Sequence, residues 1–138
     1  MCIRDRLYTP FDEVLERSDI ITLHCPLMPG THNMLAGAEF RKMKRQPLLI
    51  NTARGGLVDE EDLVAALDQG LIGGIGFDVL TVEPPAPDHP LMKVANRANV
   101  IITPHVAWAS FEAQTECWRQ TVDHVNAFFE GQAKNLVS

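Results

Sequence analysis

Three side chains with acid, base or anion-binding chemistry stand just beyond short apolar runs of this sequence. Arg54 follows Leu48–Asn51 and precedes a pair of glycines, and His105 follows an apolar run and a proline. Glu83 lies in a proline-rich segment between them. A guanidinium binds a carboxylate through two parallel hydrogen bonds, and an imidazole can donate a proton near neutral pH. The set predicts a site that binds the carboxylate of a small 2-oxo acid and reduces its carbonyl group. A cofactor must supply the hydride, because no side chain can.

Each of these residues also has an ordinary structural interpretation. Arg54 could be a solvated loop charge, His105 could end a strand, and Glu83 beside prolines could be plain surface. Asp78 is different, because a carboxylate that ends an apolar strand needs a partner. If Glu83 reaches His105, its charge would favour the imidazolium and raise the pKa of that histidine.

Other chemistries fit the sequence less well. His24, Cys25 and His32 could suggest a metal site, but adjacent strand residues point to opposite faces and no fourth ligand has suitable spacing, so no metal is predicted. Cys25 as a nucleophile with His105 lacks a group to orient the pair. The glycines of Gly73–Gly76 lead into a strand rather than a helix, and no GxGxxG motif occurs in the sequence.

Composition narrows the class of protein. The 138 residues have room for one domain with a core, and 46% hydrophobic and 22% charged residues are ordinary for a globular protein. A net charge of -6 without a basic run gives no footprint for nucleic acid or an acidic membrane surface. No apolar run approaches membrane-spanning length. Three cysteines without CxxC spacing favour a reducing cytoplasm over a disulfide framework.

Strand and helix patterns alternate along the chain. The pattern predicts strands at 19–23, 48–51, 73–79 and 100–103 and helices at 37–43, 60–69 and 111–130, with a first helix capped by Thr9 and a stiff proline loop at 84–90. We expect Asp59 and Ser110 to cap their helices and Gly70 to end the helix before it. Phe111, Thr115, Trp118, Val122, Val125 and Phe129 recur every three or four residues, which indicates an amphipathic long C-terminal helix.

This alternation predicts an α/β fold with right-handed crossovers and a mostly parallel sheet. Four strands are few for a doubly wound sheet, so the expected fold is an incomplete doubly wound parallel sheet, the second half of a Rossmann-type domain, with a long C-terminal helix. We expect residues 1–6 to be an unplaced leader, 7–109 a partial NAD-binding domain, and 110–138 a helix that returns to a missing substrate domain.

Four segments together resemble the D-isomer-specific 2-hydroxyacid dehydrogenases. They are SDIITLHCPL (18–27), LLINTARGGLVDE (48–60), GGIGFDVLTVEPP (73–85) and TPHVAWAS (103–110). Their order and spacing match over nearly the whole chain from about Tyr8 onward. The last segment and the EPP loop look most like the glycerate dehydrogenase (hydroxypyruvate reductase) branch of the family.

The resemblance implies a role for each matching residue. Arg54 would hold the substrate carboxylate and carbonyl oxygen, His105 would be the general acid, and Glu83 would be its partner. The cofactor would be NAD or NADP, with NAD favoured. The residues implied to line it are Cys25, Pro26, Thr31, Thr52, Ala53, Arg54, Asp78, His105 and Ala107. The substrate would be a small 2-oxo or D-2-hydroxy acid, and the full-length parent is expected to be a homodimer.

The sequence also departs from the family pattern. The family carries GxGxxG, a ribose-binding residue and a separate substrate domain upstream of this region, and these are missing here. We therefore expect a C-terminal fragment that is inactive by itself. Two alternatives stay open: a dinucleotide-sensing corepressor of the same fold, and a non-functional truncated product. Formate dehydrogenase is disfavoured, because that family has glutamine where Glu83 stands.

Overall fold

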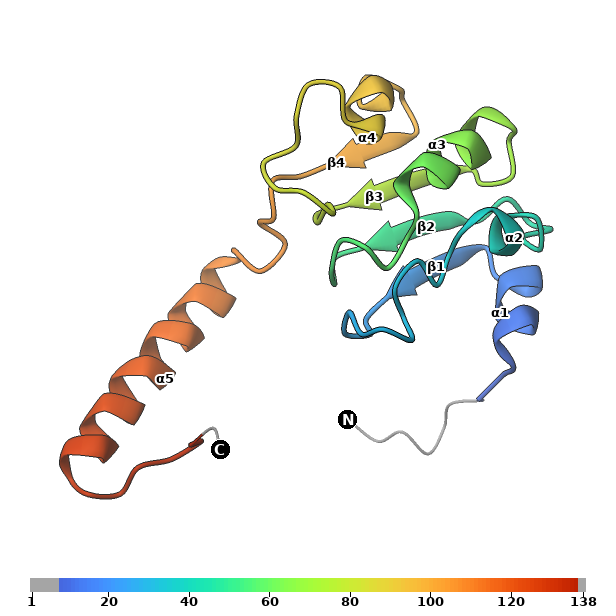
Figure 1. Ribbon diagram of the computed structural model, residues 1–138. Helices are drawn as coiled ribbons and strands as arrows, with labels where there is room; N and C mark the ends of the chain where they lie inside the picture. The colour runs from blue at the N-terminus through green and yellow to red at the C-terminus, as the bar shows by residue number, and fades with distance from the viewer. Residues whose placement is uncertain (1–7, 137–138) are drawn as a thin grey trace. The chain divides into compact units, whose positions relative to one another are not determined.

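A four-stranded parallel sheet forms the centre of the first part of the chain (Figure 1). The computed structural model describes residues 8–136, so the predicted leader at residues 1–6 lies outside the described residues. The strands are β1 (Ile20–Leu23), β2 (Leu48–Asn51), β3 (Gly74–Phe77) and β4 (Val100–Ile102), and they lie side by side in chain order. The predicted parallel α/β sheet is confirmed; β2 has its predicted bounds, and the other three strands are one to three residues shorter than their patterns.

The register of the sheet aligns the carboxyl ends of all four strands. Leu23 pairs with Asn51, Asn51 with Phe77, and Phe77 with Ile102. Ligands of open α/β sheets bind outside the carboxyl ends of their strands. The loops that leave this edge are therefore the place to look for a site.

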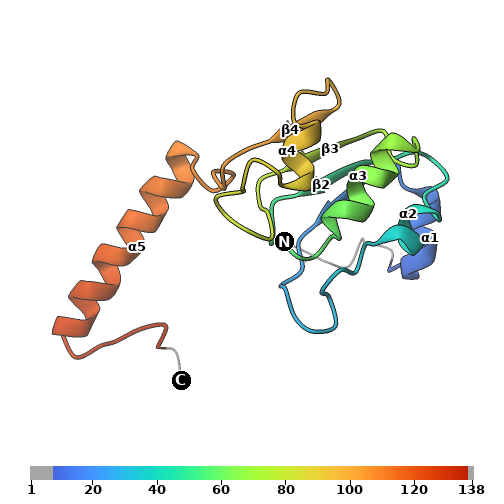
Figure 2. The same ribbon diagram turned by 45° about the horizontal axis from the view of Figure 1, so that its top comes forward.

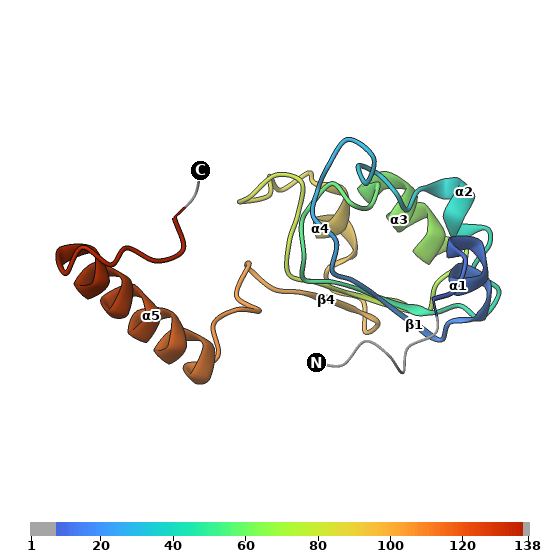
Figure 3. The ribbon, with the colours of Figure 1, turned by 90° about the horizontal axis from the view of Figure 1, so that it is seen from below.

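Helices cover one face of the sheet. They are α1 (Phe11–Arg17), α2 (Gly37–Phe40), α3 (Glu60–Asp68) and α4 (Pro90–Val94), and Figure 3 shows α2, α3 and α4 on the same side of the strands. Ile21, Leu49 and Ile75 point into this side and are at most 7% exposed. On the other face, Ile20 and Ile101 are 59% and 66% exposed. The core therefore forms on one side of the sheet only.

Local side-chain chemistry explains where α3 begins and ends. Asp59 is its N-cap, and its carboxylate accepts a hydrogen bond from the backbone N–H of Asp62 at 3.0 Å. Carboxylates in the first turn also suit the positive end of the helix dipole. Gly70 follows the helix with a φ of 66°, a left-handed conformation that glycine adopts without strain. The predicted cap and stop of this helix are confirmed.

Two predictions about helix starts are wrong. Pro10, not Thr9, is the N-cap of α1, and no side chain caps that helix. The proline-rich segment was predicted to be loop throughout, but α4 begins at Pro90. Proline is compatible with the first position of a helix, because the N–H that it lacks would have no intrahelical partner there.

The chain divides into two compact units between His105 and Val106, whereas we predicted a boundary between residues 109 and 110. The second unit contains α5 (Phe111–Phe129), a single uninterrupted helix (Figure 2). Ser110 caps it by accepting a hydrogen bond from the N–H of Ala113, as predicted. The predicted stripe is exposed, with Phe111, Trp118 and Phe129 at 81%, 71% and 82%. None of the helices in residues 8–136 is long and apolar enough to cross a membrane.

Candidate active site

The carboxyl edge of the sheet gathers the polar residues singled out in the sequence. His24 and Cys25 follow β1, Arg54 lies in the loop after β2, Asp78 follows β3, and His105 lies just beyond β4. Neighbouring strands are parallel, so these residues leave the sheet on one side. The edge is thus a common rim for groups that are far apart in the sequence.

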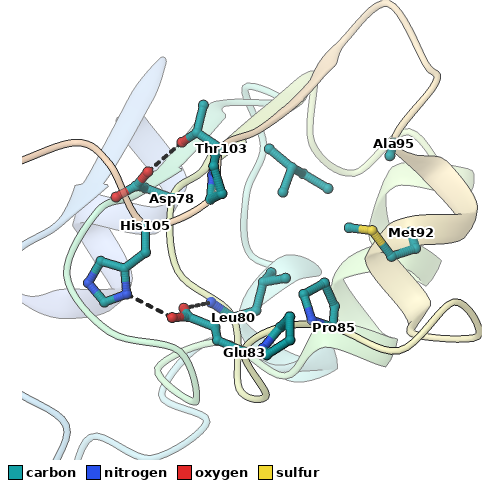
Figure 4. A pocket seen from close by; sticks show the side chains of 11 residues that line it. Asp78, Leu80, Glu83, Pro85, Met92, Ala95, Thr103 and His105 are labelled. Atoms are coloured by element: carbon teal, nitrogen blue, oxygen red, sulfur yellow. Dashed lines mark hydrogen bonds and ion pairs between the residues drawn. The ribbon is translucent and has the colours of Figure 1, made fainter. Parts of the chain in front are cut away.

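Glu83 and His105 form a hydrogen-bonded pair on this rim (Figure 4). The Nδ1 atom of His105 lies 2.7 Å from Oε2 of Glu83, and Oε1 of Glu83 accepts a hydrogen bond from the backbone N–H of Leu80 at 2.8 Å. The hydrogen bonds from His105 and then from Leu80 hold the pKa of the Glu83 carboxyl below its ordinary value of 4.5. Because Glu83 engages Nδ1, the ring can deliver a proton to another molecule only through Nε2.

The backbone of His105 is strained. Its φ is 56°, in the left-handed region that residues with a Cβ rarely adopt. This conformation follows Pro104 and turns the chain at the end of β4, where the imidazole meets Glu83. Strain of this kind is concentrated at functional sites, where the surrounding structure holds it in place.

Asp78 is buried beside this pair and has the partner that its position requires. It is 4% exposed, and the hydroxyl of Thr103 donates a hydrogen bond to its Oδ1 at 2.5 Å. The two side chains tie the end of β3 to the end of β4. The sequence predicts Thr103 as the last residue of its strand, and the strand register is what shows that it meets Asp78.

The loop that carries Arg54 is shaped by Asn51. This side chain is 1% exposed; its amide donates to the carbonyl of Arg54 at 2.9 Å, and its oxygen accepts from the N–H of Ala53 at 3.1 Å. The guanidinium of Arg54 is exposed and donates to the carbonyl of Ala53 at 2.7 Å. An asparagine at a strand end was visible in the sequence as a turn residue, but not as the residue that fixes this loop.

Gly55 brings the Arg54 loop against the segment that carries Glu83. A Cβ at position 55 would lie 2.0 Å from the carbonyl oxygen of Leu80, so the two backbones touch here. The N–H of Leu80 in turn binds Glu83, and Glu83 binds His105. Contacts therefore run from the Arg54 loop to the His105 imidazole without a break.

Two of the hollows along the rim are lined by residues predicted for the site, and both lie in the first unit. One has a volume of about 650 Å³ and is lined by His24, Cys25, Pro26, Leu27, Thr52, Ala53 and Arg54. The other has a volume of about 610 Å³ and lies between Asp78, Glu83, His105 and the apolar side chains of Met92 and Ile102 (Figure 4). Figure 4 shows the Glu83 carboxylate between the imidazole and this second hollow.

The structure brings together most of the residues predicted to line a cofactor. Cys25, Pro26, Thr52, Ala53 and Arg54 line the first hollow. Thr31 instead shapes its own loop, since its hydroxyl donates to the carbonyl of Pro26 at 2.7 Å and accepts from the N–H of Met28 at 2.8 Å. Ala107 belongs to the second unit. The roles of all these residues stay predictions.

The alternative chemistries gain no support from the described residues. Within residues 8–136, no group of three or more His, Cys, Asp or Glu side chains could hold a metal ion. The thiol of Cys25 lies 3.5 Å from the sulfur of Met34, a packing contact beneath its loop.

The topology and this rim define the class of protein as an open parallel α/β domain, in which ligands bind outside the carboxyl ends of the strands. The family model of the D-isomer specific 2-hydroxyacid dehydrogenase, NAD binding domain, matches residues 4–107. The chain therefore belongs to the D-isomer specific 2-hydroxyacid dehydrogenase family. The predicted family and fold are confirmed, and NAD is confirmed as the cofactor of this family domain.

Individual relatives agree with this assignment. The chain is 52% identical over 126 residues to a glycerate dehydrogenase of Methylorubrum extorquens. The alignment covers 91% of this chain and 40% of the relative. It is 38% identical over 131 residues to a hydroxypyruvate reductase of Blautia hydrogenotrophica, covering 95% of the chain and 40% of the relative. The chain thus spans about two fifths of the length of these relatives.

Solved structures show the same fold. A D-lactate dehydrogenase of Aquifex aeolicus in complex with NAD and lactic acid has a TM-score of 0.82 at 36% identity, over 91% of this chain and 41% of that one. An NAD complex of a D-isomer specific 2-hydroxyacid dehydrogenase of Lactobacillus delbrueckii has a TM-score of 0.85 at 32% identity. The match covers 96% of this chain and 43% of that one.

Proposed function

We propose that this chain supplies the carboxylate anchor and the acid–base pair of a dehydrogenase that acts on a small 2-oxo or D-2-hydroxy acid of the hydroxypyruvate–glycerate type. The observation that carries the proposal is the 2.7 Å contact between Glu83 and His105, on the same rim as the exposed guanidinium of Arg54. Similarity to a glycerate dehydrogenase and to a hydroxypyruvate reductase supports this substrate class.

We assign the first hollow to part of the dinucleotide, because most of the residues expected to line the cofactor lie there. It lies at the carboxyl ends of β1 and β2, and its volume of about 650 Å³ is within the usual range for ligand sites. The sequence carries no GxGxxG, so we expect the pyrophosphate contacts to come from another segment of the complete enzyme. When bound, NAD(H) supplies the hydride. We propose NAD rather than NADP as the cofactor.

Residues of this chain bind the substrate and transfer the proton. Arg54 binds the substrate carboxylate through two hydrogen bonds and thereby orients the carbonyl carbon. Nε2 of His105 donates a proton to the carbonyl oxygen as negative charge develops there. Glu83 holds Nδ1 and stabilises the charged imidazole. In the reverse direction, the same imidazole accepts the hydroxyl proton.

The test uses the complete dehydrogenase that contains this chain, assayed with hydroxypyruvate and NADH. We expect His105→Ala to lower kcat by about 10²- to 10⁴-fold, the usual contribution of a general acid. Arg54→Lys should raise KM, because lysine cannot bind a carboxylate in bidentate fashion. Arg45→Lys is the matched control, since Arg45 is exposed and pairs with Asp19 at the opposite end of β1. Unchanged turnover in His105→Ala would refute the assigned role.

Further expectations concern the complete protein. By itself, the 138-residue chain should show no significant reductase activity, and full turnover by it would contradict this. We expect the complete protein to be a homodimer. We also expect it to be located in the reducing cytoplasm. A complete protein that binds NAD and a protein partner but reduces no 2-oxo acid would favour the corepressor alternative.

A further inference from the structure

A second histidine–carboxylate pair lies beneath the segment that carries Glu83. Oε2 of Glu60 lies 3.0 Å from Nε2 of His89, and the two side chains are only 11% and 8% exposed. The other oxygen of Glu60 accepts a hydrogen bond from the backbone N–H of Thr81 at 2.8 Å. One carboxylate therefore binds two points of the chain that are eight positions apart.

The hydrogen bonds fix the form of this histidine. Nδ1 of His89 accepts a hydrogen bond from the N–H of Leu91 at 3.3 Å, as the N-cap of α4. A nitrogen that accepts carries no proton, so the proton of the neutral ring lies on Nε2 and is donated to Glu60. Glu60 must then accept on both oxygens. A carboxylate can do this, whereas the amide of glutamine has only one accepting oxygen.

Thr81 and His89 lie on either side of the loop that carries Glu83. Between them stand the residues Val82, Glu83, Pro84, Pro85, Ala86, Pro87 and Asp88. The three prolines fix their own φ angles, so the loop has few internal degrees of freedom. Its placement is therefore determined largely by where its two ends are held. Glu60 holds both ends to the first residue of α3.

We propose that Glu60 and His89 are positioning residues that act as a brace for this loop and so set Glu83 against His105. The inference rests on the proposed function, in which the Glu83–His105 contact serves the reaction. Neither Glu60 nor His89 lines the two hollows of the rim, so the brace acts on the reaction only through Glu83.

The first variant is Glu60→Gln in the complete dehydrogenase. Its single oxygen can satisfy either Thr81 or His89, and the other end of the loop is released. A displacement of about 1 Å in a catalytic group can lower the rate by roughly 10²-fold. We expect kcat to fall by about 10- to 100-fold with KM near the wild-type value, because Arg54 lies on a different loop.

The second variant separates the brace from the helix cap. In His89→Asn, the shorter side chain can still cap α4 by accepting from Leu91, since asparagine is a favourable N-cap residue. It no longer reaches Glu60. We expect the same fall in kcat as in Glu60→Gln, and no further fall in the double variant, because the two residues act as one unit. Asp68→Asn is the matched control: Asp68 ends α3 and pairs with Arg97 beyond α4, but holds no part of the loop.

Two readouts do not depend on activity. Amide hydrogen exchange of Thr81 should accelerate in Glu60→Gln, which weakens the acceptor of its N–H, and stay unchanged in Asp68→Asn. The Nδ1 proton signal of His105 in NMR spectra, which reports its hydrogen bond with Glu83, should shift or vanish in both variants. If the wild-type enzyme proves inactive, the proposed function fails while these two signals still test the brace. Glu60→Gln with normal kcat, or with an unchanged His105 signal despite a lower Tm, would overturn the inference.

Discussion

At the scale of single residues, the Glu83 carboxylate affects both the stability of the fold and the proposed proton transfer. It accepts hydrogen bonds from the imidazole of His105 and from the N–H of Leu80, and both favour its charged form. A carboxyl with a lowered pKa binds fewer protons in the folded chain than in the unfolded chain. The stability that it contributes is therefore complete above the unfolded pKa and is lost as the pH falls through the lower, folded value.

This predicts a specific pH dependence for Glu83→Gln. Glutamine can still accept from Leu80 but carries no charge to favour the imidazolium. We expect the variant to have a lower Tm than the wild type near pH 6, and the difference to shrink as the pH falls below 4.5 and the wild-type carboxylate, with its lowered pKa, becomes protonated. Thermal unfolding of both proteins across this range is the measurement. A difference that stays constant with pH would show that Glu83 contributes nothing through its charge.

Asn51 allows a second prediction at this scale. In Asn51→Asp, the oxygen that meets Ala53 is kept, but an acceptor replaces the donor that faces the carbonyl of Arg54. The site is 1% exposed, so the unmade hydrogen bond should cost about 1–3 kcal/mol in the free energy of unfolding. In the complete enzyme, KM should rise because Arg54 is displaced.

Denaturant titration and steady-state kinetics measure these two effects of Asn51→Asp. Asn99→Asp is the control, because the exposed Asn99 also donates to a backbone carbonyl, that of Gly73, away from the carboxyl edge. Equal destabilisation in both variants would mean that burial of Asn51 is unimportant.

At the scale of elements, Gly55 is where two loops of the rim meet. Its Cα packs against the carbonyl of Leu80, and a methyl group there would lie 2.0 Å from that oxygen. Backbone atoms on both sides would have to move apart. The close approach, rather than any left-handed φ, is what requires glycine at this position.

We expect Gly55→Ala to destabilise the chain by at least about 1–3 kcal/mol, as overpacking does in a closely packed interior. In the complete enzyme it should also lower kcat/KM, since it separates the Arg54 loop from the Glu83 segment. Gly30→Ala is the matched control, because a Cβ at Gly30 meets nothing within 4 Å. Chemical denaturation of both variants gives the comparison, and equal stabilities would contradict the importance of the contact.

Periodicity and turn residues predicted most of these elements from the sequence. The four strands are short β-branched or apolar runs between turn signals, and α3 and α5 carry both a cap and a periodic stripe. Helix α4 was missed because its prolines were taken only as breakers, although Pro90 occupies the one helical position that tolerates it. The first helix was capped one residue too early because Thr9 looked like a better cap than Pro10.

The site was only partly predictable, because several of its contacts join residues that are far apart in the sequence. Arg54, Glu83 and His105 were identifiable by type and by position after strands. Asp78 was seen to need a partner, but its identity as Thr103 depends on the register of β3 and β4. Likewise, nothing near Glu60 in the sequence indicates that it binds His89.

At the scale of the whole molecule, residues 8–105 leave apolar side chains exposed on one face of the sheet. Ile20, Leu48 and Ile101 are 59%, 48% and 66% exposed there, while their neighbours in sequence, such as Ile21 and Leu49, are buried under the helices. Contiguous apolar surface on a folded chain promotes association. We therefore expect this face to promote association of the 138-residue chain when it is expressed alone.

The prediction is that the chain by itself binds a hydrophobic dye and elutes as an oligomer in size-exclusion chromatography. Replacing Ile20, Leu48 and Ile101 together by threonine places β-branched residues at all three strand positions and should reduce both signals. Ile21→Thr is the control, since it places a hydroxyl in the core and should unfold the chain instead. Dye binding that is unchanged in the triple variant would place the association elsewhere.

The sequential strand order has a consequence for how the site could be transferred by recombination. Because β1 to β4 lie in the sheet in chain order, Arg54, Glu83 and His105 follow adjacent strands within one continuous segment of the chain. A single recombination event could transplant the guanidinium, the imidazole and its carboxylate together, with the Glu60–His89 pair, into another reading frame. The proposed proton-transfer pair and the residues proposed to position it would then move together.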